Sequence, residues 1–173
     1  MAEGKRPRLA RIGPDVITRY GTALIGSLLS RAISFPQLRR LAFDTIPWAP
    51  LDRPIAEATV VLITTSGVHL TSDRPFDVPD RGTFRILPRD VQAGEVTLTH
   101  PAYDRRDAQR DLNLVFPIER LRELETEGVI GRLAGEHYGF GLTPNDRDLV
   151  GPGKEVARRL EREGVDLALL VPA

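Results

Sequence analysis

The sequence predicts an α/β domain in which a mostly parallel sheet is flanked by helices in a Rossmann-like layered arrangement, preceded by an N-terminal helical segment. Short apolar runs rich in β-branched residues alternate with amphipathic segments, which is typical of strands that alternate with helices. Glycine and proline mark the borders between these segments. The chain has 173 residues, of which 41% are apolar and 28% charged, so its length and composition suit one globular domain.

Residues 1–53 are expected to form a tail, a helix and a proline-rich connector ahead of the main domain. Pro14 suits the first turn of a helix, because an N–H group at that position would have no helical partner anyway. Prolines surround Trp48 within residues 43–54, which predicts a rigid connector. We therefore place the α/β domain at residues 54–173.

Four segments of this domain are predicted to be strands. Residues 59–65 (TVVLITT) form a continuous apolar run rich in β-branched residues, which suits a strand buried on both faces of a parallel sheet. A loop through Pro79 is expected to follow it. Residues 83–87 and 96–100 are predicted to be the second and third strands, and residues 165–171 (VDLALLV) a final buried strand.

Three helices are predicted from their end signals. Asp104 can accept a hydrogen bond from the first turn of a short helix. Pro117 opens the next helix, and Gly128 ends it, because glycine readily adopts the left-handed conformation that follows many helices. A third helix is expected from about residue 154 to 163, with Gly164 as its stop.

Composition excludes several classes of function. The 24 basic residues balance 24 acidic ones, whereas a nucleic-acid-binding protein usually has a basic excess. The chain has no cysteine, so it contains no disulfide, thiolate nucleophile or cysteine-bound metal. No apolar stretch is long enough to span a bilayer, and the basic start is not followed by a secretory signal. We expect a cytoplasmic protein that binds neither nucleic acid nor membrane.

Polar residues follow the first and third predicted strands. Ligands of open parallel sheets bind beyond the carboxyl ends of the strands, so we expect these residues to share one edge. Histidine titrates near neutral pH and suits acid–base work or substrate positioning, although each histidine is equally compatible with a loop residue bonded to nearby backbone. The spacing does not indicate a metal site. The catalytic candidates are His69, His100 and Asp104, and the substrate-binding candidates are Ser66, Gly67 and Tyr103.

The third histidine, His137, has two interpretations. It can join the same edge of the sheet as the other candidates. Alternatively, residues 136–140 (EHYGF) form a packed loop in which Tyr138 and Phe140 are buried. The residue types favour the packed loop, because two large aromatic side chains flank a single glycine.

Five stretches of the sequence, in order from about residue 54 to the end, resemble the motifs of one known family. These stretches are VVLITTSGVHL at 60–70 with Asp73 and PFD at 75–77; FRILP at 84–88; His100, Tyr103, Asp104, Asp107, Asp111, NLVFP at 113–117 and RL at 120–121; GRLA at 131–134 with His137 and Tyr138; and GVD at 164–166 through LVP at 170–172. Together they resemble the selenoprotein B subunits of the glycine, sarcosine, betaine and D-proline reductases. The resemblance does not extend to the segment before Trp48.

This resemblance implies an enzyme component that reductively cleaves a carbon–nitrogen bond alpha to a carboxylate, with a dithiol as electron donor. The implied substrate is a small amino acid or betaine. The implied partners are other reductase subunits, one of which carries a pyruvoyl group that holds the substrate amine, and a thioredoxin-like or dithiol reductant.

The family's nucleophile is a selenolate or thiolate. In D-proline-type members, a strand ending in Val-Pro leads directly into selenocysteine or cysteine. Here Ala173 follows Val171-Pro172, so the resemblance implies a selenocysteine just after Ala173. We hypothesise that a UGA codon was read as a stop, which would leave a domain incomplete at its C-terminus, inactive alone and poorly soluble.

Two other functions remain open from the sequence. The chain can be a non-catalytic module that binds a small carboxylate at the His69 and His100 edge. It can also be a lyase or hydrolase that uses His69, His100 and Asp104, with or without a metal ion.

Overall fold

The computed structural model describes residues 49–76, 82–143 and 146–172. The predicted N-terminal tail, its helix and most of the proline-rich connector lie outside these described residues. Contacts divide the chain into two units, Met1–Ala49 and Pro50–Ala173, and the second contains the fold described below. None of the helices within the described ranges is long and apolar enough to cross a membrane.

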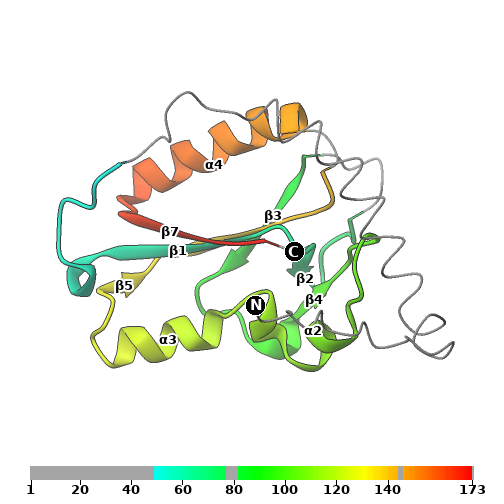
Figure 1. The fold of residues 1–173 in the computed structure, drawn as a ribbon, viewed down its shortest axis with the longest axis horizontal. Coiled ribbons are helices and arrows are strands. Elements are labelled where there is room, and N and C mark those ends of the chain that lie inside the picture. Colours follow the sequence, from blue (N-terminus) through cyan, green and yellow to red (C-terminus); the bar gives the residue numbers. More distant parts are fainter. Residues whose placement is uncertain (1–48, 77–81, 144–145, 173) are drawn as a thin grey trace, which may run out of the picture. The chain divides into compact units, whose positions relative to one another are not determined.

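The main sheet contains five strands, which confirms the prediction of an α/β domain with a mostly parallel sheet (Figure 1). The strands β5, β6 and β7 each run parallel to β1, whereas β3 is antiparallel to β6. A Rossmann-like connectivity remains a prediction. The five strands are β1 (Thr59–Thr64), β3 (Phe84–Pro88), β5 (Arg132–Leu133), β6 (Glu136–Phe140) and β7 (Leu167–Val171).

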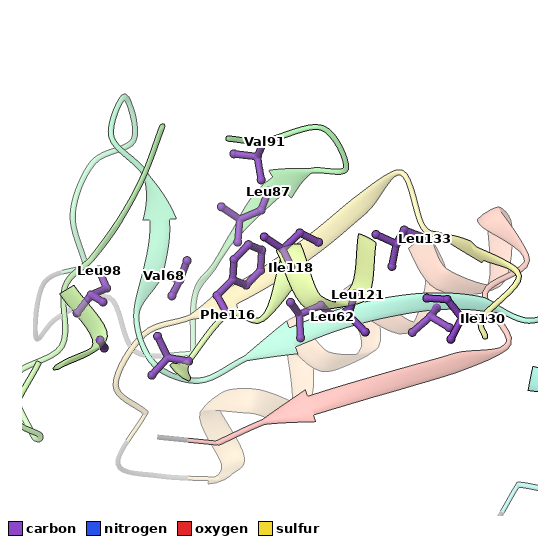
Figure 2. Packing of buried hydrophobic residues seen from close by; sticks show 13 residues of the cluster. Leu62, Val68, Leu87, Val91, Leu98, Phe116, Ile118, Leu121, Ile130 and Leu133 are labelled. Atoms are coloured by element: carbon purple, nitrogen blue, oxygen red, sulfur yellow. The ribbon is translucent and has the colours of Figure 1, made fainter. Parts of the chain in front are cut away.

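Strand β1 lies at the centre of this sheet, as its continuous apolar run predicted. β7 pairs with β1 along Val60–Thr64, so β5 and β6 share the opposite edge of β1 and pair with its first and second halves. Alternate side chains of a strand point to opposite faces. Val60 and Leu62 accordingly pack in one apolar cluster and Val61 in another, and Figure 2 shows Leu62 within the first of them.

Two helices cover the two faces of the sheet (Figure 1). The first apolar cluster lies between the sheet and α3 (Ile118–Thr126), whose Ile118 and Leu121 are buried (Figure 2). α3 begins after Pro117 and is followed by Gly128, which has φ of +71°, so both predicted end signals are confirmed.

The second apolar cluster lies on the side of α4 (Val150–Glu163), whose Val156 is buried. α4 ends at Gly164 in the left-handed conformation, as predicted. It begins earlier than the predicted residue 154, because Pro152 is tolerated in a first turn where its missing N–H leaves no hydrogen bond unmade. The short helices are α2 (Arg106–Arg110) and the 3₁₀ turns η2 (Ile55–Glu57), η3 (Ala93–Glu95), η4 (Leu112–Leu114) and η5 (Asp146–Leu149).

The predicted third strand belongs to a separate sheet, which corrects its assignment to the main one. β4 (Val96–Leu98) pairs antiparallel with β2 (Val68–Leu70), a strand that the sequence did not predict. β2 is only three residues long, and that is too short to show a periodic pattern. A loop was therefore expected where the chain instead turns at Gly67 and enters β2.

Residues 136–140 form the strand β6 and not the packed loop that was predicted. Tyr138 and Phe140 are buried, which confirms that part of the prediction. Gly139 faces the backbone of Val68, where a Cβ atom would come within 2.0 Å of the Val68 carbonyl oxygen. Glycine inside a strand commonly marks such a close backbone approach, so Gly139 belongs to the strand and does not break it.

The last strand, β7, is less buried than predicted. Leu169 and Leu170 are 38% and 68% exposed. β7 pairs only with β1 among the described strands, so its other edge is open and its apolar side chains are incompletely covered. An apolar run cannot by itself distinguish a central strand from an edge strand, because both have the same composition.

Replacement of Leu170 by lysine is expected to raise the solubility of the chain, because an open edge strand with exposed leucines promotes association. The free energy of unfolding should change by less than about 1 kcal/mol, since Leu170 makes few buried contacts. Solubility and urea unfolding measure the two effects. The control Leu62→Ala, at a fully buried site, should lose about 2–5 kcal/mol. A loss of that size for Leu170→Lys would contradict the prediction.

Candidate functional site

The carboxyl end of β1 forms the base of the candidate site. Ser66 is fully buried, and its hydroxyl lies 2.5 Å from Thr64 Oγ1. The Ser66 hydroxyl is also 3.5 Å from the carbonyl oxygen of Val115, to which it can donate. These contacts occupy the Ser66 side chain, so the hydroxyl holds the turn together and is not presented to a ligand.

Gly67 joins the two sheets through its backbone. Its N–H donates to Phe140 O at 2.9 Å, and its carbonyl oxygen accepts from the Thr99 N–H at 2.8 Å. Its φ of +75° lies in the left-handed region, and a Cβ atom here would lie 2.1 Å from Thr99 O. Only glycine fits both conditions, which explains the residue type at this turn.

His100 and Tyr103 lie above this turn with their rings 4.8 Å apart. The Tyr103 hydroxyl donates to Ser66 O at 3.0 Å. His100 is 6% exposed, and its Nδ1 accepts from the Ala102 N–H at 3.3 Å, so the proton of the neutral ring is on Nε2. Burial, followed by the charge of Arg105, lowers the pKa of His100, and burial raises the pKa of Tyr103. Both groups are therefore uncharged at pH 7.

His69 is placed inside β2 and is 1% exposed. Its Nδ1 donates to Leu70 O at 2.7 Å, and this leaves Nε2 to accept from the Thr99 hydroxyl at 3.0 Å. Phe76 packs edge-on against the ring. Because both ring nitrogens are occupied, the geometry favours a structural role over the predicted catalytic one.

Asp104 caps the short helix α2 by accepting from the Arg106 N–H at 3.1 Å, as its position suggested. Its carboxylate is exposed and also pairs with the Arg106 guanidinium. Hydrogen bonds from the Arg106 side chain and backbone lower the pKa of Asp104 to about 2. An ionised, ion-paired carboxylate is a poor proton donor or acceptor at neutral pH, so the geometry gives little support to a catalytic Asp104.

The end of β7 reaches the same edge of the sheet. Val171 O accepts from the Thr65 N–H at 3.1 Å, one residue before Ser66. The structure thus brings together Ser66, Gly67, His100 and Tyr103. His69 is linked to this group indirectly, because Thr99 bonds to His69 through its hydroxyl and to Gly67 through its N–H. The sequence did not single out Thr65 as the residue that bonds to the end of β7. The one feature that could have indicated it is that the carboxyl ends of parallel strands meet at the same edge of a sheet.

No group of three or more histidine, cysteine or carboxylate side chains suitable for a metal ion occurs in the described part of the chain. The convergence of His69, His100 and Asp104 that a metal-dependent lyase or hydrolase would need is therefore not observed there. Asp104 instead faces Arg106, and His69 faces Thr99.

His137 does not join the edge of the sheet. It is fully buried in β6, where Nδ1 accepts from the Leu62 N–H at 3.1 Å, at the point of β1 between its pairings with β5 and β6. Nε2 has no hydrogen-bond partner among the described residues. Burial, with smaller contributions from Arg122 and Arg89, lowers the pKa of His137 to about 4. The neutral His137 ring thus acts as a hydrogen-bond acceptor for the backbone of β1.

Gly67→Ala is expected to lower the free energy of unfolding by at least about 2 kcal/mol, because the new Cβ meets backbone atoms and the left-handed φ disfavours alanine. Gly153→Ala is the matched control. Gly153 lies in α4 with open space around its Cβ position, so alanine should stabilise the chain by about 0.5–1 kcal/mol. Urea unfolding of both variants tests the difference, and equal effects would refute it.

Acidification is expected to destabilise the chain through His137. The unfolded histidine, with its pKa of 6.5, binds a proton between about pH 6.5 and pH 4, while the buried ring does not. Unfolding therefore becomes easier as pH falls through this window, by at most about 3 kcal/mol. Asparagine can offer its Oδ1 to the Leu62 N–H without titrating.

The measurement is the free energy of unfolding from pH 7 to pH 4 for the wild type and His137→Asn. The variant should show a flatter pH dependence, although its stability at pH 7 is lower. Parallel curves for the two proteins would show that His137 does not carry the effect, since all other titrating groups are shared.

Residues 36–173 match the family of glycine/sarcosine/betaine reductase selenoprotein B. The D-proline reductase subunit gamma of Acetoanaerobium sticklandii is 36% identical over 125 residues, which are 71% of this chain and 52% of that protein. The sarcosine reductase complex component B subunit beta of Peptoclostridium acidaminophilum is 31% identical over 139 residues, 74% of this chain and 31% of that protein.

The glycine reductase complex component B subunit gamma of Carboxydothermus hydrogenoformans is 30% identical over 140 residues, covering 75% of this chain and 31% of that protein. The chain thus spans between 31% and 52% of the length of these curated relatives. No solved structure matches it. The family match covers most of the chain, including every residue of the site, and confirms the resemblance: the chain belongs to the glycine/sarcosine/betaine reductase selenoprotein B family.

Proposed function

We propose that this chain is part of an amino-acid reductase, of the glycine, sarcosine, betaine or D-proline type, that cleaves a carbon–nitrogen bond alpha to a carboxylate. Family membership supports the proposal, and the relatives are named as subunits of reductases for D-proline, sarcosine, glycine and betaine. Those names also support other reductase subunits as the partners of this chain. A dithiol, free or in a thioredoxin-like protein, is the proposed electron donor.

The observation that carries the proposal is the hydrogen bond between Thr65 N–H and Val171 O. It brings the carboxyl end of β7 next to the Ser66 turn, on which Tyr103 and His100 are held. Thr65 and Pro172 are both exposed at this point. This edge therefore fits the selenocysteine or cysteine that the resemblance assigns to the position after Ala173.

Cleavage of the bond breaks C–N and forms one C–H and one N–H bond, which takes an electron pair and two protons. Oxidation of a dithiol to a disulfide supplies both. The residues of this chain contain no thiol, so the selenolate or thiolate nucleophile comes from outside them. The pyruvoyl group that the resemblance assigns to a partner subunit would hold the substrate amine.

The proposed contribution of this chain is to bind and orient the substrate at the edge. His100 is neutral at pH 7 and offers its Nε2–H as a hydrogen-bond donor. Tyr103 is fixed by its hydrogen bond to Ser66 O, and its ring packs against the His100 ring. Because neither ring can turn without losing a hydrogen bond, the site is preorganised, which favours precise orientation of a small substrate.

A second candidate function is a carboxylate-binding module without turnover. The observation in its favour is that the 173 residues contain no cysteine, while the neutral His100 donor is present. Sequencing the native gene beyond the Ala173 codon separates the two functions. An in-frame UGA followed by an open frame with cysteine is expected for the reductase, whereas an ordinary stop codon favours the binding module.

His100→Ala is expected to lower kcat/KM of the complete reductase by about 10²-fold, the usual loss when a positioned polar side chain at the reacting centre is removed. Release of amine or opening of the proline ring, with dithiothreitol as donor, measures the rate. Asp107→Asn is the control, because Asp107 is exposed and, within the described ranges, forms an ion pair only with Arg110 at 3.5 Å. Equal activities for His100→Ala and the wild type would contradict the placement of the site.

A further inference from the structure

Arg105 is a half-buried cation beside the candidate site with most of its hydrogen-bonding capacity unused. The only hydrogen bond of its guanidinium within the described ranges is a long one, 3.5 Å from Nη1 to Leu98 O. A guanidinium carries five N–H donors and is always charged. No carboxylate of the described residues lies within ion-pair distance of it.

The acidic residues of the same segment do not neutralise Arg105, because each has another partner. Asp104 pairs with Arg106, and Asp107 pairs with Arg110. Asp111 accepts from the Asn113 N–H at 3.0 Å. The segment from Asp104 to Asp111 thus has a balanced charge in sequence, with three arginines and three aspartates, yet its fold leaves Arg105 without a carboxylate partner among the described residues.

His100 supplies a second donor at the same place. Its Nδ1 is occupied by the Ala102 N–H, so the neutral ring holds its proton on Nε2, which makes no hydrogen bond to the described residues. The Arg105 guanidinium lies against the Leu98 carbonyl oxygen, two residues before His100. Burial, and after it the charge of Arg105, lower the pKa of His100. The fold thus holds a positive charge beside the segment that carries the neutral N–H donor of His100.

We infer that Arg105 and His100 together bind the carboxylate of a small amino acid or betaine, an inference that rests on the proposed function for the identity of the substrate. The planar fork of a guanidinium matches a carboxylate, and a charge-assisted bond to it is among the stronger polar contacts. The relatives are named for glycine, sarcosine, betaine and D-proline. These compounds share the carboxylate and differ at the nitrogen, so the shared group is what this site recognises.

Matched ligand pairs test this recognition on the purified chain. D-Proline and betaine carry the carboxylate, whereas pyrrolidine and tetramethylammonium are their counterparts without it. NMR titration of backbone amides should show that only the two carboxylates shift the signals of Tyr103, Arg105 and their neighbours. Binding of the two amines at the same residues, or no binding of either carboxylate, would overturn the inference.

Variants test the assigned residue. Arg105→Gln should weaken carboxylate binding by about 10- to 100-fold, the usual effect of removing a charged hydrogen-bond partner. Arg105→Lys keeps the charge without the fork and should fall between Arg105→Gln and the wild type. Arg110→Gln removes the same charge from an exposed position at the other end of α2 and should leave binding unchanged. Equal losses for Arg105→Gln and Arg110→Gln would overturn the inference in favour of general charge attraction.

A readout that does not depend on ligand is the pKa of His100, followed by NMR of its ring. Arg105→Gln should raise this pKa, because it removes a nearby positive charge. An unchanged pKa would show that the guanidinium is too distant to share a ligand with His100. Circular dichroism of each variant establishes that the fold is retained.

Assays of the complete reductase distinguish failure of this inference from failure of the proposed function. If the chain binds carboxylates through Arg105 but the complete enzyme with a dithiol cleaves no C–N bond, only the proposed function fails. If cleavage occurs and Arg105→Gln leaves KM unchanged, the inference fails and the proposed function stands.

Discussion

The backbone of Gly67 is the constraint on which the site depends. One residue donates to Phe140 O in the main sheet and accepts from Thr99 N–H beside the small sheet, with a left-handed φ that other residues rarely adopt. The turn sets where β2 starts and therefore where β4 and the residues after it lie. His100 is brought over the carboxyl end of β1 by this turn, even though its strand is not part of the main sheet.

The three histidines show how the same side chain takes different states within one domain. His69 has both nitrogens bonded, and His137 gives Nδ1 to the sheet and buries Nε2 without a partner. His100 has one nitrogen fixed by backbone and the other directed away from any described partner. Hydrogen bonding separates His69, whose two nitrogens are both occupied, from the other two histidines. Burial separates His137, which is 0% exposed, from His100, which is 6% exposed. His100 is thus the histidine with capacity left for a ligand.

The parts of the fold that depend on local signals could be predicted from the sequence. β1 follows from its apolar run, and the ends of α3 and α4 follow from Gly128 and Gly164. The short strands β2, β5 and β6 were not predicted, because their pairing is decided by distant backbone contacts and not by a periodic pattern.

Prediction of the site had a similar limit. The rule that parallel strands end at one edge does not explain the position of His100, because β4 lies in the separate antiparallel sheet and the Gly67 turn brings His100 to the end of β1. The rule also could not tell which charges stay unpaired. Three arginines and three aspartates lie within residues 104–111 and in principle allow many pairings, of which the fold selects the ones that satisfy Asp104 and Asp107. Arg105 remains without a carboxylate partner among the described residues because Arg106 pairs with Asp104 and Arg110 pairs with Asp107. An unpaired charge of this kind can be identified only after every other ion pair has been assigned.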